Sequence, residues 1–171
     1  ACADVDEVAA KRAVDECGFD RLYLGYEQML AEEDLDAVVV ITPHHVLKDA
    51  AIAAIESGSH VFIEKPMALN HEQGRQIVDA AKQAGVSVMV GYCQRFAEAR
   101  LFIKSVIDRG GIGDLVQVNA AKGGAGYSGW MADPKKGGGP LLYVGVHLTD
   151  QLLWLTGREA ERVYAEIVWG P

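Results

Sequence analysis

The sequence lacks the features that mark disulfide-stabilised, cysteine-ligated and membrane proteins. Its three cysteines, Cys2, Cys17 and Cys93, are scattered and form no C-x-x-C pair. An odd, dispersed set of this kind indicates free thiols in a reducing, cytoplasmic compartment. No apolar run approaches the ~20 residues that a membrane-spanning helix needs. The N-terminus shows no basic segment followed by an apolar one, so neither a membrane span nor a secretory signal is expected.

An excess of basic residues is also missing. Sixteen Lys and Arg residues stand against twenty-four Asp and Glu residues, which gives a net charge of −8. Phosphate backbones and anionic lipids repel such a chain, so we expect neither nucleic acid nor a membrane as a partner. The five histidines show no metal-ligand spacing, and no metal site is expected. Half of the 171 residues are hydrophobic, which is sufficient for a sizeable core.

Strand-like and helix-like segments alternate through the first half of the sequence. Continuous apolar runs, such as residues 36–43, are typical of strands that helices cover on both faces. Their order is that of βαβ units, so we predict an α/β fold with a Rossmann-type parallel sheet. The predicted strands are residues 1–4, 22–24, 36–43, 60–63 and 86–92, and the predicted helices are residues 6–17, 26–33, 45–57 and 70–84.

The pattern changes after residue 92. A glycine-rich stretch at 123–139 is long for a compact domain, and such loops are often functional. We therefore divide the chain into an incomplete dinucleotide-binding domain, residues 1–92, and the start of an α/β substrate domain with an open mixed sheet, residues 93–171. The elements predicted in the second part are helices at 96–109 and 141–156 and strands at 115–121 and 163–169.

The stretch HVFIEKP, residues 60–66, ends a predicted buried strand in a charged pair. Ligands bind at the carboxyl edge of an open parallel sheet, which makes Glu64 and Lys65 candidates for a binding site. Pro66 has no N–H and holds Lys65 in an extended conformation. Lys65 could polarise a substrate oxygen there, or it could be a solvated lysine at a strand end.

Two further candidates carry a chemically useful group. His147 lies four residues after Tyr143 in a predicted helix, so both side chains would share one face. A histidine is suited to proton transfer near neutral pH; a satisfied core histidine is the alternative. Asp150 could orient the imidazole or cap a neighbouring group. Asp4 follows a predicted strand, where an acid can accept hydrogen bonds from an adenosine ribose or simply cap the next helix.

Five stretches, taken in order, carry a more specific signal than any one of these residues. They resemble the Gfo/Idh/MocA family of NAD(P)-dependent sugar and polyol oxidoreductases over nearly the whole chain. The stretches are LDAVVVITP (35–43), AIAAIESGSHVFIEKPMA (51–68), VGYCQRF (90–96), GGIGDLVQV (110–118) and GGGPLLYVGVHLTDQLLWLTG (137–157).

The resemblance implies a role for each candidate residue and a homo-oligomer built through the second domain. Lys65 matches the lysine that contacts substrate near the nicotinamide, and His147 matches the catalytic histidine. Asp4 has no arginine nearby to receive a 2′-phosphate, so NAD is expected over NADP. The other cofactor-side matches are Thr42, Pro43, His44 and Glu64, and the other substrate-side matches are Gln94, Arg95 and Tyr143.

Three departures from the family pattern qualify these roles. Tyr143 stands where many members have an aspartate, and Leu47 stands where many have a histidine. No G-x-G-x-x-G precedes Asp4, although the family's first strand and phosphate-binding turn belong there. The chain thus resembles the middle of a family member, and we expect weak NAD binding and self-association of the 171 residues alone.

The activity implied is hydride transfer between a nicotinamide cofactor and a sugar or cyclic polyol carbon. His147 would take the hydroxyl proton while Lys65 polarises the same oxygen. The alternative is a truncated, non-catalytic ligand-binding or assembly module that keeps the family fold. The sequence names neither the sugar nor the direction of the reaction.

Overall fold

The computed structural model describes residues 1–123 and 126–166. The chain divides into two compact units. The first unit contains residues 1–91 together with 126–143, and the second contains residues 92–125 together with 144–171. Residues 126–143, which the division by sequence places in the second domain, therefore group with the first unit.

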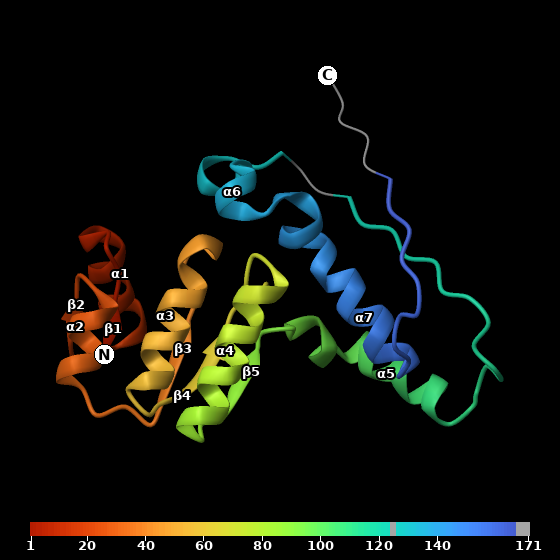
Figure 1. The fold of residues 1–171 in the computed structure, drawn as a ribbon, viewed down its shortest axis with the longest axis horizontal. Coiled ribbons are helices and arrows are strands. Elements are labelled where there is room, and N and C mark those ends of the chain that lie inside the picture. Colours follow the sequence, from red (N-terminus) through yellow and green to blue (C-terminus); the bar gives the residue numbers. More distant parts are fainter. Residues whose placement is uncertain (124–125, 167–171) are drawn as a thin grey trace. The chain divides into compact units, whose positions relative to one another are not determined.

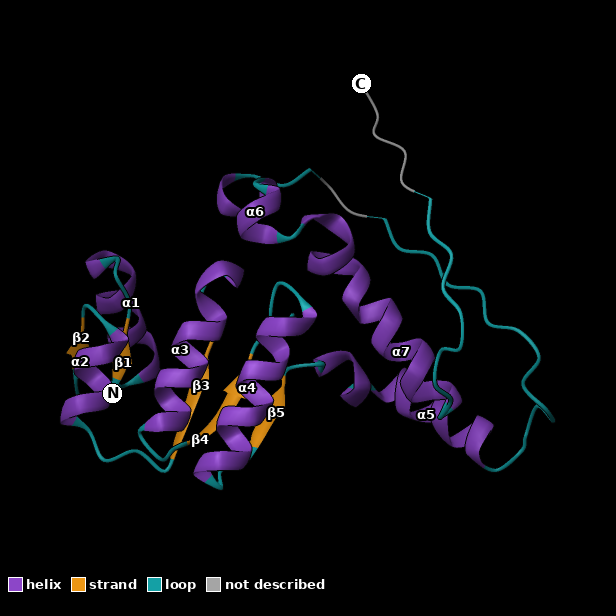
Figure 2. Cartoon of the chain, in the orientation of Figure 1, coloured by secondary structure: helices purple, strands orange, loops and turns teal. Residues whose placement is uncertain are grey.

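The first unit contains two parallel sheets (Figure 2). In one, β1 (Cys2–Ala3) pairs with β2 (Leu22–Tyr23). In the other, the strand order is β3 (Ala37–Val40), β4 (His60–Ile63), β5 (Val88–Val90). Every pairing is parallel, which confirms the prediction of βαβ units. Among the described strands, β1 and β3 are not paired with each other, so the two sheets are separate.

The helices of the first unit begin and end at residues that the sequence marks as caps. The Asp6 side chain accepts from the second and third backbone N–H groups that follow it, and the Asn70 side chain accepts from Gln73 N. Gly18 and Gly85 end their helices in the left-handed conformation, at φ 72° and 70°, where glycine has no Cβ penalty. The helices are α1 (Glu7–Cys17), α2 (Tyr26–Glu32), α3 (His44–Glu56) and α4 (His71–Ala84).

The core of the first unit lies between the three-stranded sheet and helices α3 and α4, which lie on the same side of it (Figure 1). Alternate residues of the strands point into this core, as the period of two along a strand requires. Leu47, Ile55 and Ile77 are the largest helical side chains that are fully buried there. The sheet residues in the core are Val38, Val40, Val61 and Ile63.

The described residues leave the opposite face of this sheet uncovered. Val39, Phe62 and Met89 are register neighbours on β3, β4 and β5. Val39 is 63% exposed and Met89 is 50% exposed. The prediction that helices cover the β3 run on both faces is therefore wrong for the described structure. A continuous apolar sequence shows what a strand tolerates, but it does not show which elements cover the strand.

The second unit consists of helices joined by irregular segments. It contains the 3₁₀ turn η1 (Cys93–Phe96) and helices α5 (Glu98–Asp108) and α7 (Val146–Thr156). The predicted strand at 115–121 is wrong, because these residues have no regular secondary structure. The same holds for 163–166 of the other predicted strand, whose residues 167–169 lie outside the described residues. Alternation suits a strand, but a strand also needs a partner to pair with.

A returning segment, defined here as residues 126–143, belongs to the first unit although it follows the start of the second. The part of it predicted as loop contains the 3₁₀ turn η2 (Gly129–Ala132) and the short helix α6 (Pro134–Gly137). The turn η3 (Leu141–Gly145) is π-helical and leads directly into α7.

Within the described ranges, no helix is long and apolar enough to cross a membrane.

Candidate functional site

Lys65 is held at the carboxyl end of β4 by contacts within the first unit. Its side chain is 12% exposed, and Nζ donates a hydrogen bond of 3.0 Å to the backbone carbonyl of Tyr143. The same Nζ lies 4.6 Å from the centroid of the Tyr143 ring, a cation–π geometry. Glu64 Oε1 lies 3.8 Å away. Lys65 is therefore not the solvated lysine that the sequence left open, and its peptide bond to Pro66 is cis.

The carbonyl that binds Lys65 comes from the π-helical turn η3. π-helical turns are rare and occur frequently at functional sites. The sequence predicts one continuous α-helix over residues 141–156. Residues 141–145 instead form the π-helical turn, and the α-helix begins at Val146.

His44 is the first residue of α3 and is 4% exposed. Its Nδ1 lies 2.9 Å from the carbonyl oxygen of Gly137. A carbonyl can only accept, so Nδ1 carries the proton in this contact. The ring centroid lies 4.7 Å from that of Trp130 and 5.4 Å from that of Tyr143. Burial lowers the pKa of His44, and the nearby charge of Lys65 lowers it further, against the opposing effect of the Gly137 carbonyl.

The glycine triplet 137–139 allows this contact for a steric reason. A Cβ on Gly137 would lie 2.8 Å from the carbonyl oxygen of Met131, which is closer than real Cβ atoms approach. Gly138 has φ 77°, a conformation that side chains disfavour. Glycine at these two positions therefore permits the close turn that directs the Gly137 carbonyl to His44.

The cofactor-side candidates lie at the carboxyl ends of β1 and β3. Asp4 is exposed, and its Oδ1 accepts a hydrogen bond of 2.9 Å from Asp6 N. Thr42 Oγ1 is buried, and among the described residues it has no hydrogen-bond partner. Pro43 caps the N-terminus of α3. An acid with exposed oxygens and an unsatisfied hydroxyl at this edge fit the ribose and linker oxygens of a dinucleotide.

His147 lies in α7 of the second unit and is buried. The ring of Tyr92 lies edge-on to the imidazole at a centroid distance of 6.5 Å. Burial, followed by the charge of Asp150, raises the pKa of Tyr92. His147 thus lies against an aromatic neighbour that the sequence analysis did not select. Tyr92 ends the predicted strand 86–92 and lies in the family-like stretch VGYCQRF, but neither feature marked its side chain as a neighbour of His147.

Asp150 has a partner that the sequence did not indicate. Its carboxylate accepts from Arg95, with Nε lying 3.1 Å from Oδ1 and 2.9 Å from Oδ2. Arg95 Nη2 also donates to Oδ1. This hydrogen bonding raises the pKa of Arg95. Gln94 Oε1 accepts from Gln151 Nε2, so both substrate-side candidates of η1 contact side chains of α7.

The sequence analysis did not select Trp130 or Gly137, which contact His44 across 86 and 93 positions of the chain. Both belong to the glycine-rich stretch, whose length was the signal for Trp130; Gly137 also begins the last of the five family-like stretches. Within the described residues, no group of three or more His, Cys, Asp or Glu side chains could hold a metal ion.

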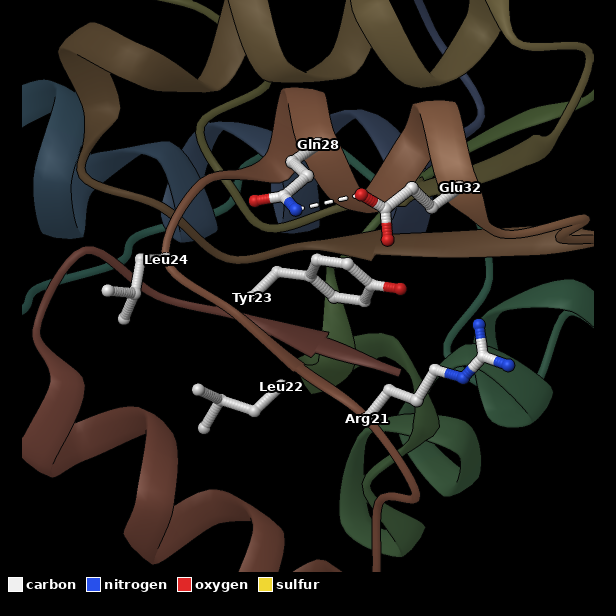
Figure 3. A pocket seen from close by; sticks show the side chains of 6 residues that line it. All are labelled: Arg21, Leu22, Tyr23, Leu24, Gln28 and Glu32. Carbon is white, nitrogen blue, oxygen red and sulfur yellow. Dashed lines mark hydrogen bonds between the residues drawn. The ribbon is translucent and has the colours of Figure 1, made fainter.

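A hollow of about 540 Å³ lies along β2 and α2 and contains none of the predicted site residues (Figure 3). Polar side chains that line it form hydrogen bonds with neighbouring side chains of the same unit. Gln28 Nε2 donates to Glu32 Oε1 at 2.8 Å, and the Tyr23 hydroxyl donates to Glu33 Oε1 at 2.8 Å. We therefore interpret the hollow as part of the surface at the edge of the two-stranded sheet, and not as the candidate site. Its lining residues are Arg21, Leu22, Tyr23, Leu24, Gln28 and Glu32.

Comparison with known proteins identifies the family. Residues 1–92 match the oxidoreductase family GFO/IDH/MocA with its NAD-binding Rossmann fold, and residues 101–169 match the family's C-terminal domain. The chain belongs to the GFO/IDH/MocA family. This confirms the resemblance drawn from the five stretches and the Rossmann-type fold predicted from the βαβ pattern.

Individual relatives include enzymes that act on sugars and polyols. The chain is 28% identical over 166 residues to levoglucosan dehydrogenase of Pseudarthrobacter phenanthrenivorans, covering 91% of this chain and 42% of the relative. It is 31% identical over 157 residues to inositol 2-dehydrogenase 2 of Saccharopolyspora erythraea, covering 91% of this chain and 45% of the relative. The chain thus spans less than half the length of these relatives.

Solved structures agree with this assignment. An NAD-binding oxidoreductase from Klebsiella pneumoniae superposes with a TM-score of 0.76 at 31% identity, covering 91% of this chain and 43% of that one. Levoglucosan dehydrogenase in complex with NADH and levoglucosan superposes with a TM-score of 0.79 at 28% identity, covering 91% and 44%.

Proposed function

We propose that this chain is part of an NAD-dependent dehydrogenase that acts on a hydroxyl or keto carbon of a sugar or cyclic polyol. The observation that carries the proposal is the Lys65 ammonium, which is shielded from solvent and held by Tyr143 at the carboxyl edge of a parallel sheet. An ammonium fixed at this edge can donate to a substrate oxygen and stabilise the negative charge that develops on it.

NAD, when bound, accepts the hydride that leaves the carbon being oxidised. Asp4 would bind its ribose hydroxyls, and the Thr42 hydroxyl and the backbone at Pro43 would line the same edge. In the oxidative direction, we propose that His147 takes the hydroxyl proton while Lys65 polarises that oxygen. No metal takes part. Gln94, Arg95 and Tyr143 would complete the substrate side.

We propose that Tyr143 has a role different from the one that the family pattern gives to an aspartate at this position. Its ring and carbonyl both contact Lys65, so we propose that it orients the lysine and contacts the substrate. Two further expectations remain proposals: an enzyme of the reducing cytoplasm, and a homo-oligomer formed through the second unit.

The experiment that tests this function uses the polypeptide encoded by the whole reading frame that contains this sequence. Inositols, levoglucosan and glucosides are offered with NAD, and NADH formation is followed at 340 nm. Lys65→Met and His147→Ala should each lower kcat by about 100-fold or more, with NAD affinity little changed. Lys82→Met and His71→Ala, at exposed positions of α4, are the matched controls.

The two candidate functions differ in one result. A dehydrogenase forms NADH with at least one of these substrates, and both site variants stop it. A non-catalytic binding or assembly module that keeps the family fold forms none. A kcat within a few-fold of wild type in both variants would remove Lys65 and His147 from the mechanism.

A further inference from the structure

His44 has surroundings that its position in the sequence does not explain. The family resemblance places this residue beside the cofactor. In the structure its ring is buried against the returning segment instead, with Nδ1 directed at the Gly137 carbonyl and the ring packed on Trp130 and Tyr143. Its neighbour His45 is exposed. The side chain at position 44 therefore contacts the protein where the resemblance implies a contact with the dinucleotide.

Tyr143 connects His44 to Lys65. Its ring meets that of His44 and also lies under the Lys65 ammonium, while its carbonyl accepts from the same Nζ. The ring of Tyr127 packs edge-on against it at a centroid distance of 5.0 Å. The position of Tyr143 thus determines where the Lys65 ammonium is held, and the returning segment determines the position of Tyr143.

We propose that His44 is a positioning residue for the proposed hydride transfer: it binds Gly137, packs against Tyr143, and so keeps Tyr143 in place to orient Lys65. This inference rests on the proposed function, and it assigns His44 to the lysine instead of to the cofactor. Removing the imidazole leaves the buried Gly137 carbonyl without its hydrogen-bond donor. A buried acceptor without a donor destabilises the folded state. The segment then shifts, and Lys65 loses its carbonyl and its aromatic contact together.

The kinetic test separates the two roles. In the polypeptide of the whole reading frame, His44→Leu should lower kcat by about tenfold and leave the Kd for NAD within about twofold. His44→Asn keeps an N–H donor near the position of Nδ1 and should recover most of kcat. His45→Leu makes the same substitution at the neighbouring exposed histidine and should change neither quantity. His44→Phe keeps the ring without the donor and replaces His44→Leu if that variant does not fold.

A second measurement needs no activity. Lysines of the polypeptide of the whole reading frame are reductively methylated with ¹³C-formaldehyde, and the Lys65 signal is assigned with Lys65→Arg. A methylated amine over the Tyr143 ring should be displaced upfield by the ring current. The displacement should collapse in His44→Leu and persist in His45→Leu.

The outcomes decide the inference. A raised Kd for NAD with unchanged kcat in His44→Leu would assign His44 to the cofactor and overturn it, as would an unchanged Lys65 signal in that variant. If no substrate is oxidised by the wild type, the proposed function fails. The Lys65 signal then still shows whether His44 positions the lysine.

Discussion

Substituting Arg95 and substituting Asp150 should lower the free energy of unfolding by different amounts, although the two residues form one ion pair. The Asp150 side chain is 6% exposed, whereas that of Arg95 is 39% exposed. Arg95→Met therefore leaves a carboxylate buried without its cation. Removing one partner of a buried pair costs about 3–5 kcal/mol. Since solvent reaches the guanidinium side of this pair, we lower the expected loss in the free energy of unfolding to about 2–3 kcal/mol.

The reverse change should cost less. Asp150→Asn leaves a guanidinium that water can hydrate, and we expect a loss of about 1–2 kcal/mol, the range of a hydrogen bond to a charged group. Arg95→Met combined with Asp150→Asn removes both charges and should cost less than the sum of the two single changes. The exposed i, i+4 pair of Lys104 and Asp108 on α5 is the matched control. Breaking it should cost under about 0.5 kcal/mol.

The assay is urea unfolding with one tryptophan reporter in the second unit. Trp154 lies in α7, so Trp130→Phe and Trp169→Phe provide a background in which Trp154 alone reports on that unit. Equal losses for the two single variants, or strict additivity in the double variant, would refute the argument that Asp150 depends on Arg95.

Three other outcomes follow from particular residues. The pKa of His44 is lowered on folding, so its contribution to stability is complete above the unfolded pKa of about 6.5 and declines as the pH falls toward the folded pKa. The urea concentration at the unfolding midpoint should therefore be lower at pH 5 than at pH 7, and this difference should be smaller in His44→Leu. Asp4 should make kcat/KM higher with NAD than with NADP, and Asp4→Ser should lower the ratio of these two values. A preference of the wild type for NADP would contradict this. The apolar row Val39, Phe62 and Met89 should make the 171-residue chain self-associate, and Val39→Lys with Met89→Lys should reduce its light scattering; a monodisperse wild-type chain would show that the row does not drive association.

Local patterns were enough to predict the helices and strands within residues 1–91. Asn70 and Gly85 bound α4 through contacts made within one turn, so the sequence alone marks both ends. The parallel pairing of β3, β4 and β5 follows from helices placed between strands. What covers β3 does not follow, because the exposure of Val39 depends on elements that pack against the sheet from elsewhere in the chain or outside it.

The sequence predicted individual residues of the candidate site, but it did not predict the contacts between them. Lys65 follows a strand and precedes a proline, so its place at a sheet edge can be read locally. The carbonyl of Tyr143 that holds it lies 78 positions away, and no periodicity predicts such a contact. The bond between Arg95 and Asp150 spans 55 positions. Sequence spacing describes one helix at a time, so it carries no signal for a partner of Asp150 on η1.

Lys65 and His147 are each fixed by the unit that carries them. Lys65 depends on the returning segment, which docks on the first unit through His44 and Tyr143. His147 lies among contacts made by the second unit, where Tyr92 meets its ring and Arg95 joins η1 to α7. The proposed reaction needs an electrophile and a base together, so it requires both units to be folded. We therefore expect damage to either set of contacts to lower the proposed turnover, each for a separate structural reason.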